Sequence, residues 1–144
     1  MQIIGRKEKI DLPEIGLKNI DAKIDTGAYG SALHCHKIEV RQKNGKDILT
    51  YKLLDPSHHS YENRVLKSED YSLKTVRSSN GLKETRYTIK TKIIVFNKTY
   101  NIEFSLTDRK GMKTPILLGR KFLSKRFLVD VNSKDLSHKQ TKLN

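Results

Sequence analysis

Apolar and polar residues alternate along most of the chain, and this period of two is typical of half-buried β-strands. The segments that show it predict strands over Ile20–Asp25, Leu73–Arg77, Glu84–Tyr87, Tyr87–Phe96, Thr99–Leu106 and Phe127–Val131. Helical spacing is scarce, and its best candidate is a short helix over Arg120–Lys125. Many short strands joined by turns predict an all-β fold, either a small barrel or a sandwich.

Turn residues separate the predicted strands. Asn80-Gly81 lies between two of them and predicts a β-hairpin, because both residues tolerate a positive φ. Asn97-Lys98 predicts a second turn, and residues 55–60 read as a loop. From residue 133 onward the chain is polar. We therefore expect one domain over residues 1–132, followed by a polar flexible tail over residues 133–144.

Length and composition narrow the class of protein. The chain has 144 residues, which suits one domain. Its longest apolar run, Ile93–Phe96, has four residues, far below the roughly 20 that a membrane helix needs. Met1–Arg6 lacks the apolar stretch of a signal peptide, and Cys35 is the single cysteine, so no internal disulfide can form. We expect a cytoplasmic protein without a membrane partner.

The charge indicates an acidic partner. Lysine and arginine total 29 against 16 acidic residues, which gives a net charge of +13 and a pI near 9.8. Such a domain attracts polyanions, which include nucleic acid, the ribosome and acidic peptides, although a lysine-biased, solvated surface is equally compatible. Tryptophan is absent and the aromatic residues are not clustered, which disfavours base stacking on single strands.

Two motifs far apart in the chain carry candidate chemistry. Asp25-Thr26-Gly27-Ala28 follows a predicted strand directly, so Asp25 can present its carboxylate to a cleft. Thr26 can fix the turn through its hydroxyl, and Gly27 allows another group to approach closely. The second motif is Thr114–Arg120, in which aliphatic residues precede Gly119 and Arg120. This order of motifs, with a glycine-tipped hairpin between them, resembles the retroviral-type aspartic proteases.

A closer resemblance covers about residues 3–131. The chain is similar to the bacterial family known as RimK-associated or "ATP-dependent zinc" proteases (RimB-like), which has a retropepsin-like fold. The matching stretches are Ile4–Glu8, Leu12–Leu17, Ala22–Ala28, Ser31–His34, Val76–Gly81, Glu84–Tyr87, Leu106–Arg109 and Pro115–Leu123. The resemblance implies an acid-protease barrel with a flap hairpin and one short C-terminal helix.

The same resemblance implies a substrate and a partner. Family members are linked to an ATP-grasp ligase that adds glutamates to a small-subunit ribosomal protein, and the protease is proposed to trim that acidic tail. We therefore expect an acidic peptide or a glutamate-tailed ribosomal protein as substrate, and an ATP-grasp glutamate ligase as a further partner. The basic charge is compatible with both expectations.

The mechanism implied by this family needs two carboxylates that share a proton, one acting as base toward water and the other polarising the scissile carbonyl. The chain holds one Asp-Thr-Gly, so we expect a homodimer with one Asp25 per subunit. In retroviral enzymes the terminal strands interleave at the dimer interface, and Phe127–Val131 is the matching strand. No metal or cofactor is required by this mechanism.

The expected site residues fall into three groups. The catalytic loop is Asp25, Thr26 and Gly27; the substrate-binding residues are Ala28, Ser31, His34, Arg77, Asn80, Gly81 and Arg86; the structural support is Gly119 and Arg120. Retroviral enzymes carry acidic residues directly after the alanine, one of which pairs with the arginine of the second motif. Tyr29 and Gly30 stand at these positions, so Arg120 needs another partner.

Other interpretations stay open. His34 and His36 could face the same way on a strand, with His58 and His59 as further zinc ligands, yet their spacing matches no known zinc motif. Cys35 could act as a nucleophile only with a nearby base. The arginines and lysines of the hairpin could be solvated surface charge, or they could clamp substrate carboxylates. Finally, the chain could be a non-enzymatic basic β-module that binds ribosomal RNA or an acidic partner.

Overall fold

Strands cover most of the chain in the computed structural model, which describes residues 1–77, 80–108 and 114–143. The strands are β1 (Gln2–Gly5), β2 (Lys7–Leu12), β3 (Leu17–Ile24), β4 (Ser31–Lys43), β5 (Lys46–Leu53), β6 (Val65–Ser68), β7 (Ser72–Arg77), β8 (Lys83–Val95), β9 (Lys98–Thr107), β10 (Ile116–Leu118) and β11 (Phe127–Asp130). The helices are the 3-10 turn η1 (Pro13–Ile15), α1 (Arg120–Leu123) and α2 (Leu136–Leu143). Within the described ranges, none of these helices has the length and apolarity to cross a bilayer.

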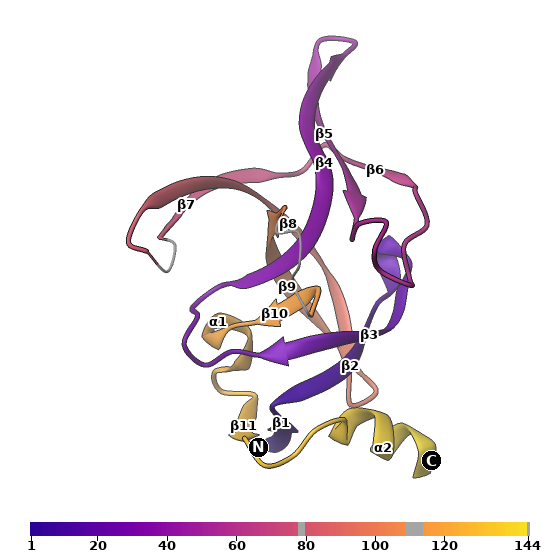
Figure 1. Cartoon of the computed structure of the whole chain (residues 1–144), viewed down its shortest axis with the longest axis vertical. Helices are drawn as coiled ribbons and strands as arrows, with labels where there is room; N and C mark the ends of the chain where they lie inside the picture. Colours follow the sequence, from indigo (N-terminus) through magenta and orange to yellow (C-terminus); the bar gives the residue numbers. More distant parts are fainter. Residues whose placement is uncertain (78–79, 109–113, 144) are drawn as a thin grey trace.

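The strands close into a barrel. The order β10-β3-β2-β8-β9-β4 returns to its start, because the short β10 pairs with β3 on one side and with β4 on the other. Figure 1 shows β10 lying between these strands beside α1. The fold is therefore the all-β, retropepsin-like barrel that the sequence predicts, and β10 is the element that joins its two halves.

Alternation along the strands fills the barrel. In β2 every second residue is buried, ending with Ile10 and Leu12, and β9 repeats this pattern with Ile102, Phe104 and Leu106. Most polar residues of these two strands lie on the other, more exposed face, as in an antiparallel sheet with one solvated face; Glu8 of β2 is an exception and is fully buried. The same core continues into a group of aromatic rings that joins α1 and β11 to the β8–β9 turn. The rings are those of Phe96, Tyr100, Phe122 and Phe127, and they contact one another in tilted and edge-on arrangements.

The two ends of the chain meet below the barrel. β1 and β11 pair in parallel as a separate two-stranded sheet, with Ile3 beside Leu128. Helix α2 occupies most of the segment that the sequence analysis expects to be a polar flexible tail. Ser137 is buried, its Oγ accepts a hydrogen bond from the Phe96 N–H, and its own N–H donates to the Glu8 carboxylate at 2.9 Å. These contacts fix the start of the helix against the barrel.

Two hairpins project from the barrel (Figure 1). β7 and β8 form the predicted flap hairpin, with Arg77 opposite Lys83 as their last paired residues before the tip. Residues 78–79 of the tip lie outside the described residues. β4 and β5 form a second, longer hairpin that the sequence analysis did not predict, and Asn44 and Gly45 turn it with φ of 54° and 77°.

Most predicted boundaries agree with the structure to within a few residues. The turn between β8 and β9 falls on Phe96 and Asn97, both at positive φ, one position before the predicted Asn97-Lys98. The short helix ends at Leu123 and not at Lys125. Residues 55–60 form a loop, as predicted.

Candidate active site

The loop after β3 holds Asp25 in place by backbone hydrogen bonds. The Asp25 N–H donates to the Leu118 carbonyl of β10 at 2.9 Å, which ties the loop to the barrel. One carboxylate oxygen of Asp25 accepts the Gly27 N–H at 3.0 Å. A Cβ on Gly27 would lie 3.3 Å from that oxygen, so glycine leaves the carboxylate room in this turn. Asp25 also lines the cleft described below.

Gly119 forms the closest contact of the site. A Cβ at this position would lie 2.2 Å from the Gly30 carbonyl oxygen and 2.6 Å from that of Tyr29, both of which are backbone atoms. The Gly119 N–H donates to the Ser31 hydroxyl at 3.1 Å. The second motif therefore packs directly on the loop that follows Asp25, and only glycine fits there.

Arg120 supports the same loop from helix α1. Its N–H donates to the Ala28 carbonyl at 2.8 Å, and its guanidinium donates to the Thr26 carbonyl at 2.9 Å. The guanidinium also lies over the Tyr29 ring, 5.9 Å from the centroid. These contacts identify the partner that the sequence left open. The guanidinium of Arg120 thus contacts a backbone carbonyl and an aromatic ring, whereas the corresponding arginine of retroviral enzymes pairs with a carboxylate.

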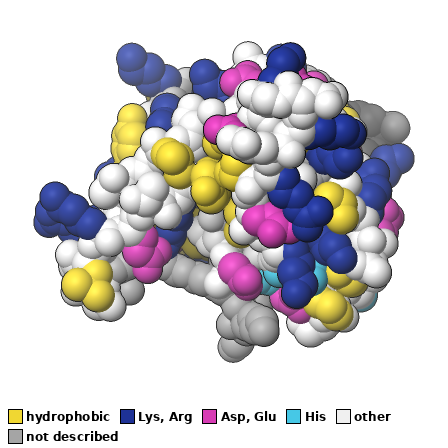
Figure 2. Space-filling model, turned by 90° about the horizontal axis from the view of Figure 1, so that it is seen from above, with side chains coloured by type: hydrophobic (Ala, Val, Ile, Leu, Met, Phe, Trp, Pro, Cys, Tyr) yellow, Lys and Arg dark blue, Asp and Glu magenta, His cyan; other side chains and the backbone are white. Residues whose placement is uncertain are grey.

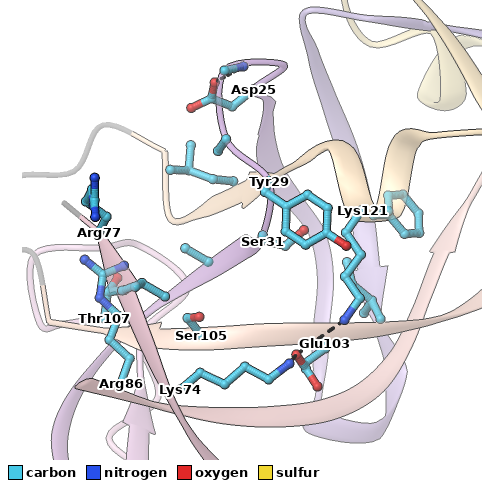
Figure 3. A pocket seen from close by; sticks show the side chains of 18 of the residues that line it. Asp25, Tyr29, Ser31, Lys74, Arg77, Arg86, Glu103, Ser105, Thr107 and Lys121 are labelled. Carbon is cyan, nitrogen blue, oxygen red and sulfur yellow. Dashed lines mark hydrogen bonds and ion pairs between the residues drawn. The ribbon is translucent and has the colours of Figure 1, made fainter. Parts of the chain in front are cut away.

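A cleft of about 890 Å³ opens beside Asp25, between the loop, the flap strands and β9 (Figure 3). Six of the predicted site residues line it: Asp25, Gly27, Ala28, Ser31, Arg77 and Arg86. The other predicted residues of the loop and flap, Thr26, Asn80 and Gly81, are not part of its lining. Gly119 and Arg120 do not line the cleft either, and both contact the loop that follows Asp25.

Basic side chains dominate the charge of the cleft. Lys74, Arg77 and Arg86 come from the flap strands, while Lys121 and Arg126 come from the α1 region. The carboxylates among the described lining residues are Asp25 and Glu103. The sequence analysis chose Arg77 and Arg86, and Lys74 was among the hairpin lysines that it considered as carboxylate ligands. Lys121 and Arg126 could not be found from sequence, because they lie on elements that approach the cleft only in the folded barrel.

Glu103 sits between two of these lysines. Lys74 donates a hydrogen bond to Glu103 Oε1, and Lys121 Nζ lies 3.7 Å from the same oxygen. The hydrogen bond from Lys74 and the nearby charge of Lys121 lower the pKa of the Glu103 carboxyl, against the opposite effect of burial. Glu103 is therefore ionised at neutral pH.

His34, which the sequence analysis expects to bind substrate, is not among the residues that line the cleft. It is buried, and its Nε2 lies 2.6 Å from Asp55 Oδ2, while its Nδ1 lies 3.2 Å from the Thr107 carbonyl. Hydrogen bonds from Ser57 and then from His34 hold the pKa of the Asp55 carboxyl well below its usual value. This pair links β4 to the loop after β5.

The other metal and nucleophile candidates are separated from one another. His36 Nε2 lies 2.9 Å from the Tyr61 hydroxyl, and His58 stacks on His59 with ring centroids 4.5 Å apart. Across the described ranges, no three His, Cys, Asp or Glu side chains are grouped so that they could hold a metal ion. Cys35 is fully buried, which raises the pKa of its thiol and disfavours the thiolate that a nucleophile requires.

Comparisons with known proteins bear on this geometry. A family model described as "Retropepsin-like aspartic endopeptidase RimB" matches residues 3–140. Proteins named "Probable alpha-L-glutamate ligase" from Parasynechococcus marenigrum and Desulfotalea psychrophila are 33% and 29% identical over 133 and 130 residues, or 89% and 90% of this chain. The chain spans only 28% of their length.

A solved structure has the same fold. The crystal structure of a protein of unknown function from Legionella pneumophila subsp. pneumophila str. Philadelphia 1 aligns with a TM-score of 0.73 at 26% identity, over 94% of this chain and 98% of that one. The overall fold of this chain is therefore also found in another bacterial protein.

Proposed function

The chain belongs to the RimB-like family of retropepsin-like aspartic endopeptidases, and on this premise we propose that it is a homodimeric peptidase in which Asp25 of each subunit activates water. The observation that carries the proposal is the position of Asp25. Its loop is held rigidly by β10 and α1, and its carboxylate faces a cleft large enough for an extended peptide.

The chemistry requires two carboxylates close together. Proximity pushes their proton affinities apart, so that one is ionised and takes a proton from water while the other is protonated and polarises the scissile carbonyl. Water then attacks the carbonyl carbon, and the nitrogen of the leaving amine receives a proton as the C–N bond breaks. The second carboxylate is supplied by Asp25 of the other subunit. Gly27 leaves space for this approach, and Thr26 offers its carbonyl to Arg120, which steadies the loop.

The terminal strands supply a surface for the second subunit. Ile3 of β1 and Leu128 of β11 are register partners, and both are about half exposed, at 49% and 57%. Val131, directly after β11, is 69% exposed. Exposed apolar side chains beside an unpaired strand edge favour association with another chain. These exposed side chains support the proposal that residues 127–131 lie at the dimer interface.

The substrate class follows from the charge of the cleft. Five basic side chains line it, and arginine binds carboxylates through two hydrogen bonds at once. In Figure 2, lysine and arginine side chains are also spread over the visible face around exposed hydrophobic ones. We propose that the substrate is an acidic, glutamate-rich tail of a ribosomal protein. Arg77 and Arg86 read it from the flap, and Ala28 and Ser31 lie beside its backbone.

The named relatives suggest the partner. Proteins called probable alpha-L-glutamate ligases contain a region similar to nearly the whole of this chain. A ligase that adds glutamate makes the kind of tail that a peptidase with a basic cleft would shorten. We propose that an ATP-grasp glutamate ligase works on the same substrate as this protein, in the cytoplasm.

The test is mass spectrometry of a glutamate-tailed peptide incubated with the protein, with Asp25→Asn and with a matched control, Asp47→Asn. Asp47 is exposed and does not line the cleft, so its substitution removes the same charge elsewhere. We expect the tail to shorten with the wild type and the control, and the rate to fall at least about 100-fold with Asp25→Asn.

Two results would contradict the proposal. Loss of cleavage in a chelator would move the mechanism to zinc. A salt-sensitive affinity for RNA, with no cleavage at any pH or protein concentration, would favour the non-enzymatic basic module.

A further inference from the structure

Three charged side chains from three separate elements meet at one side of the cleft. Lys74 comes from the flap strand β7, Glu103 from the barrel strand β9 and Lys121 from helix α1. Both lysines approach the same oxygen of Glu103, Oε1. Figure 3 shows the group across the cleft from Asp25, with the Arg77 and Arg86 guanidinium groups on the other side of the view. Lys74, Glu103 and Lys121 are called the lysine–glutamate cluster below.

The charges within this cluster do not balance. Two ammonium groups share one carboxylate, which leaves one positive charge directed at the cleft. The lysine side chains are 44% and 51% exposed, whereas that of Glu103 is only 18% exposed. A carboxylate entering from the cleft can therefore reach the ammonium groups, and it would compete with Glu103 for them.

The cluster is also tied to the catalytic loop. The Lys121 N–H donates to the Tyr29 carbonyl at 2.9 Å, so the backbone that carries this lysine is fixed to the loop that follows Asp25. Lys74 is the register partner of Arg86 across the flap hairpin. Through Glu103, the cluster connects the flap to the part of the site that holds Asp25.

We propose that Lys74 and Lys121 form a subsite for one substrate carboxylate, and that Glu103 occupies this subsite when no substrate is bound. The inference rests on the proposed function for its substrate. Glu103 then acts as an internal competitor, which selects against peptides that bring no carboxylate to this position. A substrate glutamate releases the lysines from Glu103, and a glutamine, which carries no charge, does not.

The test measures binding and not cleavage, so it stays valid even if the protein is not a peptidase. It uses the full chain with Asp25→Asn, which cannot cut the probe, and two fluorescent peptides of equal length, one rich in glutamate and one with glutamine in its place. Adding Glu103→Gln should tighten binding of the glutamate peptide by about two- to fivefold and leave the glutamine peptide unchanged. The gain should shrink as salt is raised.

Lysine variants complete the test. Lys74→Gln and Lys121→Gln should each weaken binding of the glutamate peptide by about two- to fivefold. Lys98→Gln is the matched control, because Lys98 is exposed on the same strand as Glu103 but does not line the cleft, and it should change binding much less. Circular dichroism checks that each variant is folded.

Two outcomes would overturn the subsite. If Glu103→Gln weakens binding of the glutamate peptide, as the lysine variants do, then Glu103 positions the lysines and does not compete with the substrate carboxylate. If the variants change the binding of both peptides equally, the cluster does not recognise a substrate carboxylate. Failure of the proposed function has a separate signature, in which the wild type leaves the glutamate peptide uncut although the binding differences are present.

Discussion

The Asp25 loop and the flap wall face each other across one cleft, yet they are built in different ways. The loop is held by backbone hydrogen bonds to Leu118 and Arg120 and by the close contact at Gly119. The flap strand β7 pairs with β8, and it presents exposed, charged side chains to the cleft. The first region fixes the position of one reactive group, and the second offers charge over a wide area.

This difference predicts how each region responds to substitution. A change that moves the loop backbone displaces the reacting atoms, and a displacement of about 1 Å can cost on the order of 100-fold in rate. A change of one exposed charge removes an interaction that water and salt already weaken. We therefore expect large, salt-independent effects in the loop and small, salt-dependent effects on the flap.

The largest effect is expected for Gly119→Ala. The added methyl would meet the backbone oxygen of Gly30 at 2.2 Å, which forces β10 and the loop apart. We expect the free energy of unfolding to fall by about 2–3 kcal/mol, in the upper part of the range for overpacking, together with loss of cleavage. Urea denaturation followed by circular dichroism measures the free energy of unfolding.

Gly30→Ala is the matched control for stability, because a Cβ at Gly30 meets nothing within 4 Å and its φ is not in the left-handed region. It should change the free energy of unfolding by less than about 1 kcal/mol. Equal destabilisation by the two alanines would contradict the assignment of Gly119 as the close contact that supports the loop.

A smaller effect is expected for Arg120→Met. Methionine keeps an unbranched apolar stem but cannot donate to the Thr26 carbonyl. Loss of one hydrogen bond of about 0.5–1.5 kcal/mol should lower kcat by about two- to tenfold and leave KM for an acidic peptide nearly unchanged. A rise in KM with an unchanged kcat would show that Arg120 binds substrate and does not support the loop.

The strand that leaves the loop adds a pH dependence. β4 begins at Ser31 and carries His34. Hydrogen bonds from Ser57 and then from His34 hold the pKa of the Asp55 carboxyl below its usual value near 3.8. Below that pH the unfolded chain protonates Asp55 while the folded chain keeps it ionised. This part of the stability is therefore complete above about pH 4 and is lost as the pH falls further.

Asp55→Asn should remove this dependence. Thermal unfolding measured between pH 6 and pH 2 is expected to show a shallower fall of Tm with acid in the variant than in the wild type. Identical acid profiles would contradict the role of the His34–Asp55 pair.

The smallest effects are expected on the flap. Arg77 is exposed, and Arg77→Gln should raise KM for a glutamate-rich peptide by about two- to fivefold at low salt, without a change in Tm. The difference should disappear near 1 M salt, where the screening length is about 3 Å. Arg86 differs, because its side chain is only 15% exposed and its guanidinium donates to the Glu84 carboxylate, so Arg86→Gln is expected to lower Tm as well. A loss of kcat that persists in high salt would break the comparison between the two regions.

The parts of this site that could be predicted from sequence are those contained in short, continuous motifs. Asp25-Thr26-Gly27 and Gly119-Arg120 are short motifs whose residue types have conformational or packing reasons that can be read in sequence. In the lysine–glutamate cluster, the sequence indicated only Lys74, as one of the hairpin lysines. Glu103 and Lys121 were missed because they come from β9 and α1, far from the hairpin in the chain. Only the closure of the barrel brings them together, and no spacing along the chain encodes that.

The fold shows the same division. The β4–β5 hairpin was missed although Asn44-Gly45 carries the signal that was recognised at Asn80-Gly81, so closer attention to turn residues would have found it. Helix α2 gave no such signal. Its sequence is polar, and its docking depends on Glu8, a buried carboxylate at the other end of the chain that accepts hydrogen bonds from Gly5 and Ser137.

The central claim is that two Asp25 side chains from two subunits act together. Its most direct test is the cleavage rate at constant total protein as wild type is replaced by Asp25→Asn, after the subunits have been allowed to exchange. If both carboxylates are required, activity follows the square of the wild-type fraction, and equal amounts give about one quarter of the full rate. A linear fall, to about half, would show that each subunit works alone and would contradict the account.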